Sequence, residues 1–386
     1  MVKKNMSEFS PRHPAPPFSS RSGHQTLPQI DLQRAWGAKM CDLGTALLRC
    51  LPPEWSHHLG LKLIEGPWIP EALLPPAFTA EIGLKCKVPG IGLLSHPVGL
   101  AAGFDKNAVA PHGFRRLGFS MIEVGTVTPR AQLGNPKPRL FRYPDERALI
   151  NRMGFNNDGA LQIAARLKAS SWNQEITPLG VNCGKNKDTP NKNAVGDYLQ
   201  VIDLFHPLAQ YLVVNISSPN TPGLRELATP EFVQQLGHEL GPKFLPKVWI
   251  KVDPDLPRRD FQRLVQTISD VGFQGIILTN THRVQFPESG GQSGHPLLSA
   301  STSCLEWAYE VHRGKLPMIA AGGILSGIDI FQKIVRGALA VQIYTALVYR
   351  GPWTVYRLLL ELVCELKLRG FSSIEEAQGS FYDRSS

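Results

Sequence analysis

The sequence has no apolar run of the roughly 18 residues that a membrane-spanning helix needs, and its N-terminus lacks the apolar core of a secretory signal. Its six cysteines include no CxxC pair and no Cys/His cluster with zinc-site spacing. These absences argue against a spanning anchor, a metal site and a disulfide framework. Scattered thiols favour a protein on the cytosolic side of a membrane. Any membrane association predicted from the sequence is therefore peripheral.

The chain does have enough length and apolar content for a large core. Of its 386 residues, 42% are hydrophobic, which is typical of a globular protein with one big domain and a smaller one. The net charge of +9 favours an anionic partner, such as a nucleic acid, an acidic lipid surface, or a phosphorylated or carboxylated ligand. Charge alone does not choose among these partners, and a solvated basic surface explains it equally well.

The N-terminal part divides into a tail and a pair of helices. Residues 1–30 are rich in Pro, Ser, Arg and His, which predicts a flexible basic tail, and the prolines argue against an amphipathic transit peptide. Two helices are predicted at 32–51 and 54–64, separated by Pro52-Pro53. The apolar stripe of the first consists of Leu32, Trp36, Met40, Leu43, Leu47 and Leu51. This hairpin either packs on the main domain or leaves part of its apolar face open to lipid or a hydrophobic ligand.

After residue 98, short apolar strands alternate with longer amphipathic helices, which is the pattern of a parallel sheet. Strands are predicted at 98–102, 121–125, 179–182, 211–215, 248–252, 275–279, 318–321 and 340–344. Helices are predicted at 111–117, 160–169, 194–206, 230–240, 259–271, 301–313, 328–335 and 353–369. Eight such units predict an α/β fold of the (β/α)8 TIM-barrel type. A doubly wound open sheet is the alternative, but no GxGxxG opens the first unit.

These patterns divide the chain into a tail at 1–30, a helical hairpin domain at 31–75, the barrel at 76–372 and a C-terminal tail at 373–386. Polar side chains gather after the predicted strands, above all in the loop at 215–225. Because the carboxyl ends of barrel strands share one mouth, we expect these side chains to converge there. Lys106 and Lys251 bring positive charge, several asparagines bring amide groups, and Gly322-Gly323 can offer backbone N–H groups to a phosphate. The set predicts a flat phosphorylated cofactor and a planar substrate with amide groups.

Eight ordered motifs also carry a family resemblance. They are VGLAAGFDKN (98–107), EVGTVTPRAQLGNPKPRLFR (123–142), INRMGFNN (150–157), LGVNCGKNKDT (179–189), YLVVNISSPNTPGLR (211–225), TNT (279–281), AAGGI (320–324) and VQIYTAL (341–347). Together they resemble dihydroorotate dehydrogenases of the quinone-using, membrane-associated class 2. The resemblance implies an FMN-binding barrel that oxidises dihydroorotate to orotate in pyrimidine biosynthesis.

The resemblance also implies roles for single residues. Ser218 matches the general base that removes a proton from C5 of dihydroorotate, with Thr221 or a water as its proton relay, and Ser rather than Cys at this position is typical of class 2. Matches to substrate-binding residues are Lys106, Asn151, Arg152, Met153, Gly154, Phe155, Asn215, Asn220, Asn280 and Thr281. Matches to FMN contacts are Ala101, Ala102, Gly103, Thr126, Asn182, Asn215, Lys251, Thr279, Gly294, Gly323, Tyr344 and Thr345.

The hairpin resembles the small domain through which a membrane quinone reaches the flavin, and His57, Arg142 and Tyr344 match the polar residues near the quinone head. The implied partners are dihydroorotate or orotate, a quinone (ubiquinone or menaquinone) and a membrane surface, with no nucleic acid and no metal. We expect the cytoplasmic face of a bacterial inner membrane, with the mitochondrial inner membrane as the alternative. A related FMN oxidoreductase of dihydropyrimidines that uses a soluble acceptor is the alternative function. Asp253 departs from the family pattern, and its spacing from Lys251 predicts that both lie on one strand face.

Overall fold

A closed barrel of eight parallel strands forms the centre of the computed structural model, which describes residues 32–66, 68–80, 82–172 and 174–383. In barrel order the strands are β3 (Val98–Leu100), β4 (Ile122–Val127), β7 (Leu179–Cys183), β8 (Tyr211–Asn215), β9 (Val248–Val252), β10 (Gly275–Leu278), β13 (Met318–Ala321) and β14 (Ala340–Ile343). Nearly all their residues are buried, as expected for strands covered on both faces. The predicted (β/α)8 barrel is confirmed, and closure excludes the open sheet. The tail predicted at 1–30 lies outside the described residues.

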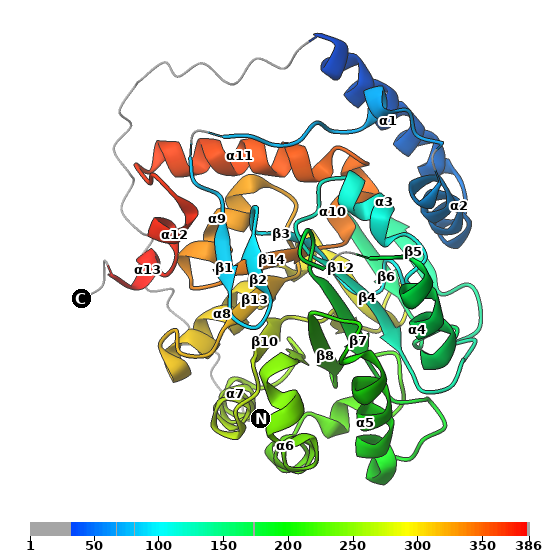
Figure 1. Ribbon diagram of the computed structural model, residues 1–386, viewed down its shortest axis with the longest axis vertical. Coiled ribbons are helices and arrows are strands. Elements are labelled where there is room, and N and C mark those ends of the chain that lie inside the picture. Colours follow the sequence, from blue (N-terminus) through cyan, green and yellow to red (C-terminus); the bar gives the residue numbers. More distant parts are fainter. Residues whose placement is uncertain (1–31, 67, 81, 173, 384–386) are drawn as a thin grey trace, which may run out of the picture.

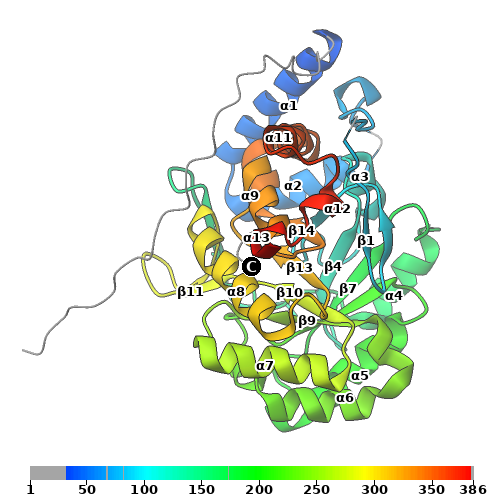
Figure 2. The same cartoon turned by 90° about the vertical axis from the view of Figure 1, so that its left-hand side faces the viewer.

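An outer layer of helices surrounds the strands (Figures 1 and 2). These helices are α3 (Pro111–Arg116), α4 (Ala160–Ala169), α5 (Ala194–Phe205), α6 (Pro230–Phe244), α7 (Arg258–Val271), α8 (Leu298–His312), α9 (Gly327–Val335) and α11 (Thr354–Leu368). Each buries one stripe against the barrel. In α7, for example, Phe261, Leu264, Val265 and Ile268 are completely buried at helical spacing.

A second sheet at the barrel mouth does not follow from the hydrophobic pattern. Its strand order is β11 (His282–Val284), β12 (Gly290–Gly294), β6 (Ala148–Asn151) and β5 (Leu140–Tyr143), all antiparallel. The sequence of β12 is Gly-Gly-Gln-Ser-Gly, which has none of the β-branched residues that mark a strand. A short hairpin of β1 (Cys86–Val88) and β2 (Gly92–Leu94) precedes the barrel.

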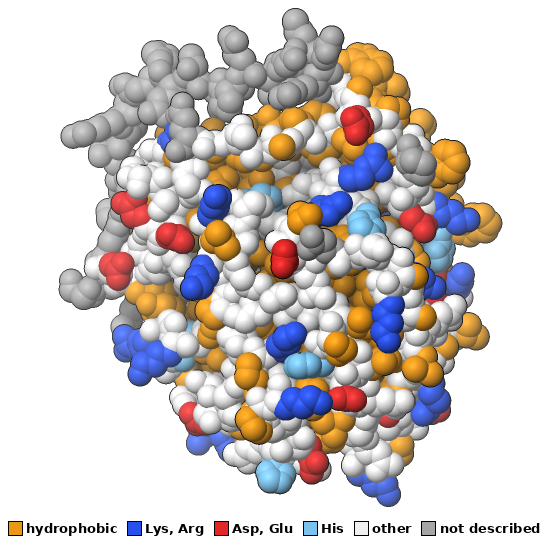
Figure 3. All heavy atoms as spheres, viewed as in Figure 1, with side chains coloured by type: hydrophobic (Ala, Val, Ile, Leu, Met, Phe, Trp, Pro, Cys, Tyr) orange, Lys and Arg blue, Asp and Glu red, His pale blue; other side chains and the backbone are white. Residues whose placement is uncertain are grey.

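The N-terminal hairpin consists of α1 (Leu32–Cys50) and α2 (Pro53–Glu65), which lie at one edge of the molecule near α10 (Thr345–Arg350) (Figure 1). Its apolar stripe stays partly exposed. Trp36, Met40, Leu43, Leu47 and Leu51 are between 41% and 63% exposed, and apolar side chains gather over this edge in Figure 3. Both interpretations of the hairpin therefore hold in part, because Leu61 and Ile64 of α2 pack against the core while much of the apolar stripe of α1 stays exposed. No helix in the described ranges is long and apolar enough to cross a membrane.

Two ion pairs attach the hairpin to the barrel domain. Glu54 at the start of α2 accepts from Arg139 at 2.7 Å, with both side chains almost buried. Asp42 of α1 pairs with Arg357 of α11 at 2.8 Å. At the other end of the chain, residues 373–383 pack against the barrel domain through α12 (Ile374–Ala377), where Ile374 is buried, and are followed by α13 (Ser380–Asp383). The segment set apart as a tail therefore joins the core.

Candidate active site

A cavity opens at the carboxyl ends of the barrel strands, where the sequence predicted a site. Its walls include Ala101, Ala102, Gly103, Lys106, Thr126, Asn151, Met153, Gly154, Phe155, Asn215, Ser218, Asn220, Lys251, Thr279, Asn280, Thr281, Gly294, Gly323, Tyr344 and Thr345. The structure thus brings together most of the residues singled out from the motifs. It does so because parallel strands place all their carboxyl ends at one edge.

Two of the residues matched to substrate or FMN contacts do not line this cavity. Asn182 is completely buried beneath it, and Arg152 turns away to pair with Glu288 at 2.7 Å. Sequence reasoning missed several lining residues: Leu140, Leu149, Ser293, Leu297, Ile324, Gln342 and Ile343. A signal existed for Gln342, because it is the one polar side chain in the strand Ala-Val-Gln-Ile. Leu140, Leu149 and Ser293 belong to the second sheet, which had no such signal.

A chain of amide hydrogen bonds forms the floor of the cavity. Thr126 Oγ1 donates to Asn182 Oδ1 at 2.6 Å, and Asn215 Nδ2 donates to the same oxygen at 3.1 Å. Asn280 Nδ2 in turn donates to Asn215 Oδ1 at 3.2 Å. Thr126, Asn182 and Asn215 come from three neighbouring parallel strands, β4, β7 and β8. The floor is consequently a fixed array of donors and acceptors, which suits a planar ligand.

The two serines after β8 have different surroundings. Ser217 Oγ is occupied, because it donates to Asn215 Oδ1 at 3.2 Å and accepts from Asn280 Nδ2 at 3.0 Å. Ser218 lines the cavity, and its Oγ only accepts, from the backbone N–H of Asn220 at 3.3 Å. Thr221 Oγ1 is buried and has no hydrogen-bond partner in the described part of the chain. The Ser218 hydroxyl therefore keeps its own proton available for transfer.

Two lysines bring positive charge to the cavity. Lys106 Nζ donates to the carbonyl of Gly103 at 2.7 Å, and burial together with the field of Arg139 lowers the pKa of Lys106 to about 8, against the opposing field of Glu54. Burial also lowers the pKa of Lys251, and the Glu123 carboxylate opposes this shift. Neither lysine is in an ion pair with a carboxylate in the described residues, which suits an anionic ligand.

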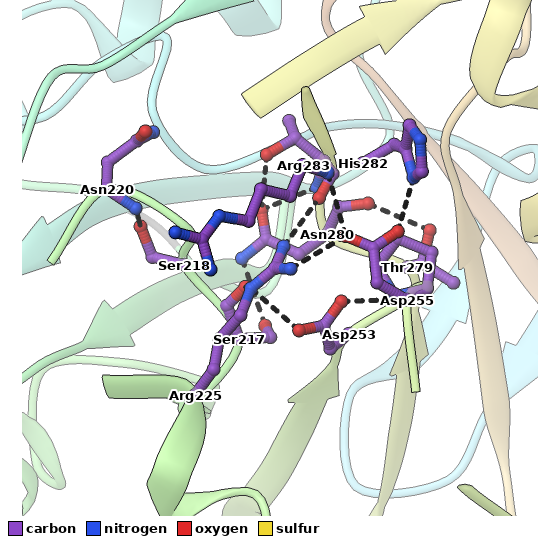
Figure 4. A network of polar contacts seen from close by, with 12 residues as sticks. Ser217, Ser218, Asn220, Arg225, Asp253, Asp255, Thr279, Asn280, His282 and Arg283 are labelled. Atoms are coloured by element: carbon purple, nitrogen blue, oxygen red, sulfur yellow. Dashed lines mark hydrogen bonds and ion pairs between the residues drawn. The ribbon is translucent and has the colours of Figure 1, made fainter. Parts of the chain in front are cut away.

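Asp253 does not pair with Lys251, as its spacing had suggested, but with Arg225 at 2.7 Å (Figure 4). The alternation of a strand does not extend to Asp253, because β9 ends at Val252. Arg225 also pairs with Asp255 at 2.6 Å and donates to the backbone carbonyls of Ser217 and Thr281. This cluster joins the loop after β8 to the loop after β10, behind Ser218.

A second, largely apolar cavity lies between the hairpin and the barrel. Its walls include His57, Arg142 and Tyr344 together with Met40, Leu47, Leu59, Leu63 and Val348. Burial lowers the pKa of His57 well below its usual value, so the imidazole is neutral at pH 7. The Phe104 ring contacts those of His57 and Tyr344 in tilted arrangements, with centroid distances of 5.2 Å and 4.9 Å. Tyr344 lines both cavities, as do Leu140 and Leu149, so the two cavities adjoin there.

The fold and the site define a (β/α)8-barrel enzyme with a polar cavity at the barrel mouth and an adjoining apolar chamber. The family model described as dihydroorotate dehydrogenase matches residues 83–366. The chain belongs to the dihydroorotate dehydrogenase family, the oxidoreductases that oxidise dihydroorotate in pyrimidine biosynthesis.

Relatives of the chain point to the quinone-dependent class. It is 42% identical to dihydroorotate dehydrogenase (quinone) of Myxococcus xanthus, over 88% of this chain and 98% of that protein. It is 40% identical to the mitochondrial dihydroorotate dehydrogenase (quinone) of Mus musculus, over 86% of this chain and 88% of that protein. The crystal structure of DHODH from Eimeria tenella in complex with ferulenol matches with a TM-score of 0.77 and 34% identity, over 86% of this chain and 96% of the other. The class 2 resemblance of the motifs is thereby confirmed.

Proposed function

We propose that this chain oxidises dihydroorotate to orotate at the barrel mouth, with FMN as its bound cofactor and a membrane quinone as the final electron acceptor. The observation that carries the proposal is the position of Tyr344, which lines both the polar mouth and the apolar chamber. An enzyme with two half-reactions needs a polar site for its substrate and an apolar site for its quinone, both close to one redox group. The two cavities meet that need.

The residues at the mouth fit a phosphorylated flat cofactor. Gly322 and Gly323 have φ of +100° and +80°, and a Cβ on Gly323 would lie 2.2 Å from Leu298 Cα at the start of α8. Only glycine allows this close approach, which leaves backbone N–H groups beside a helix N-terminus for a phosphate. Lys251, Thr279 and Thr345 would complete the FMN site. When bound, FMN accepts a hydride from the substrate and passes electrons on to the quinone.

Within this proposal the chain's own residues bind the substrate and move its proton. Lys106 holds the substrate carboxylate, while Asn151 and Asn220, joined by a 3.0 Å hydrogen bond, contact its ring amides. Ser218 Oγ takes the proton from C5. Because a serine hydroxyl is a weak base at neutral pH, it must pass on its own proton as it accepts the new one. The unpartnered hydroxyl of Thr221 is our candidate for the first acceptor, directly or through a water.

The hairpin would bring the enzyme to its quinone. Its exposed apolar stripe on α1, together with Trp55 and Trp68, suits the interface of a lipid bilayer, which implies a peripheral membrane protein. The quinone would enter between α1 and α2 and approach His57, Arg142 and Tyr344. The proposed location remains the cytoplasmic face of a bacterial inner membrane, with the mitochondrial inner membrane as the alternative.

The absorbance spectrum of the purified full chain tests this function. We expect flavin bands that bleach when dihydroorotate is added and return when a soluble ubiquinone or menaquinone analogue follows. Fumarate and NAD should fail to restore the bands, because the second chamber is apolar. Rapid reoxidation by fumarate or NAD would instead support the soluble-acceptor alternative, and a protein without flavin absorbance after FMN is added would contradict both.

The lowered pKa of Lys106 predicts how substrate binding depends on pH. The ammonium group is charged only below its pKa of about 8, so binding of the substrate carboxylate weakens as pH rises through that value. We expect kcat/KM for dihydroorotate to fall as pH rises through about 8. In the Lys106→Met variant, kcat/KM should be low at every pH and lack this decline. A wild-type profile that stays flat up to pH of about 10, near the usual lysine pKa, would contradict the assignment.

A further inference from the structure

A carboxylate that none of the steps above uses lies inside the barrel, directly below the active-site floor. Glu123 is on β4, and its side chain is completely buried. It accepts two hydrogen bonds from strands on either side of β4, from Asn182 Nδ2 on β7 at 2.8 Å and from Gln342 Nε2 on β14 at 2.6 Å. Burying a carboxylate is costly unless it is well hydrogen-bonded, so this arrangement calls for a reason.

In each hydrogen bond above Glu123, the donor is the group farther from Glu123. A carboxylate only accepts, so Asn182 must turn its NH2 group down toward Glu123 and its Oδ1 up. That oxygen in turn receives Thr126 Oγ1 and Asn215 Nδ2. Asn215 therefore presents its own Oδ1 on the far side, where it receives Asn280 Nδ2. The orientation of three successive amides follows from the one group at the bottom that cannot donate.

Gln342 is held in the same way. Because its NH2 group donates to Glu123, its Oε1 is the end left for other donors, and that oxygen is buried without a partner in the described residues. Gln342 also lines the active-site cavity. In addition, the Glu123 carboxylate is the charged group that raises the pKa of Lys251 against the effect of burial. Glu123 therefore influences Asn182, Gln342 and Lys251 at the cavity floor, although it does not line the cavity itself.

We propose that Glu123 is a positioning residue that sets the direction of this amide chain and so decides which donors and acceptors the barrel mouth presents to FMN. The inference rests on the FMN site proposed above. It assigns Asn182 and Gln342 a shared function as the two relays between Glu123 and the cavity.

The variant Glu123→Gln tests the proposal because it keeps the shape and removes the acceptor-only character. The introduced amide cannot accept from both Asn182 and Gln342 with its single oxygen, so one NH2 group faces another. We expect the Kd for FMN, measured by the fluorescence of FMN released on dilution of the full chain, to rise about tenfold or more, the effect of losing a charge-assisted hydrogen bond. The flavin midpoint potential should shift as well, because the group that faces Lys251 has changed.

A second variant restores the direction of the chain. In Glu123→Gln/Asn182→Asp, the new carboxylate at position 182 accepts from Thr126, from Asn215 and from the NH2 group of the introduced amide, while the oxygen of that amide accepts from Gln342. Each of these donors again has an acceptor, so the FMN Kd should return most of the way to the wild-type value. If the single variant fails to fold, the double variant should recover both folding and FMN binding, so the comparison still tests the proposal. The control Glu306→Gln, at an ion pair with Arg336 outside the barrel, should leave the FMN Kd unchanged.

Two results would overturn the inference. One is a Glu123→Gln protein with the wild-type FMN Kd and midpoint potential. The other is a double variant that binds FMN no better than the single one, which would mean that Glu123 serves packing or charge alone. A wild-type chain that binds no FMN would instead contradict the proposed function, so the two failures are distinguishable.

Discussion

Replacing Ser218 by Ala is expected to leave FMN bound and to slow flavin reduction by dihydroorotate about 10²–10⁴-fold, the usual loss when a positioned general base is removed. The expectation follows from the position of Ser218, which lines the cavity and whose hydroxyl proton has no acceptor in the described residues. Stopped-flow absorbance after mixing with dihydroorotate measures the rate directly. Reduction at the wild-type rate would refute the assignment of Ser218 as the base.

Ser217→Ala is the matched control, because it removes the neighbouring hydroxyl of the same loop. Ser217 Oγ is bonded to Asn215 and Asn280, so its loss should weaken substrate binding more than it slows the chemical step. We expect a higher KM for dihydroorotate and a limiting reduction rate within about tenfold of wild type, well above that of Ser218→Ala. Thr221→Val should slow reduction as well if Thr221 accepts the proton from Ser218. A Thr221→Val enzyme with an unchanged rate would leave the relay to water.

Replacing Gly60 by Phe is expected to block quinone reduction while leaving flavin reduction by dihydroorotate unchanged. Gly60 is on α2, lines the apolar chamber, and has no atom within 4 Å of the place where a Cβ would be. A benzyl group there would start from a Cβ with open space around it and extend into the chamber, and Phe is a better helix former than Gly. We expect the steady-state rate with a quinone analogue to fall by about tenfold or more, since a direct steric block removes the favourable contacts of the quinone.

The measurement compares the two half-reactions in one preparation. Flavin reduction is followed by stopped flow, and reoxidation by a quinone analogue is followed after the substrate is consumed. Gly196→Phe provides the control, because Gly196 is a helical glycine of α5 that also has open space at Cβ but lies outside both cavities. It should change neither rate. Equal loss of both half-reactions in Gly60→Phe would show that the hairpin has only a structural role.

The barrel was predictable because each of its strands is a short apolar run followed by polar residues. The run Tyr211-Leu212-Val213-Val214 and the loop after it show both signals, and β8 ends at Asn215 as expected. The second sheet was not predictable. Strand β12 holds its place by pairing with β6, residue Gly291 opposite Asn151, and its glycines carry no periodic pattern of their own. Pairing between segments 140 residues apart is a property of the folded chain alone.

The positions of some site residues were likewise predictable from the sequence, and those of others were not. Local motifs were enough to place Ser218, Asn220 and Lys106 at the mouth, because strand ends meet there whatever the details of packing. They were not enough for Arg152, because its motif predicts substrate binding whereas its side chain pairs with Glu288. Nor did they reveal the partner of Asp253, which pairs with Arg225 from the loop after a different strand. Side-chain direction beyond the end of a strand depends on partners that the sequence does not place.

The sequence by itself determined the fold, the family and the set of residues at the mouth, because hydrophobic period and motif order are local properties of the chain. Only the tertiary structure decided that the apolar stripe of α1 stays partly exposed, that Tyr344 lines two cavities, and that Glu123 lies under the floor between Asn182 and Gln342. Each of these facts depends on which distant segments come together when the barrel closes. Closure is a collective result of packing eight strands and their helices, and no local pattern encodes the contacts that it creates.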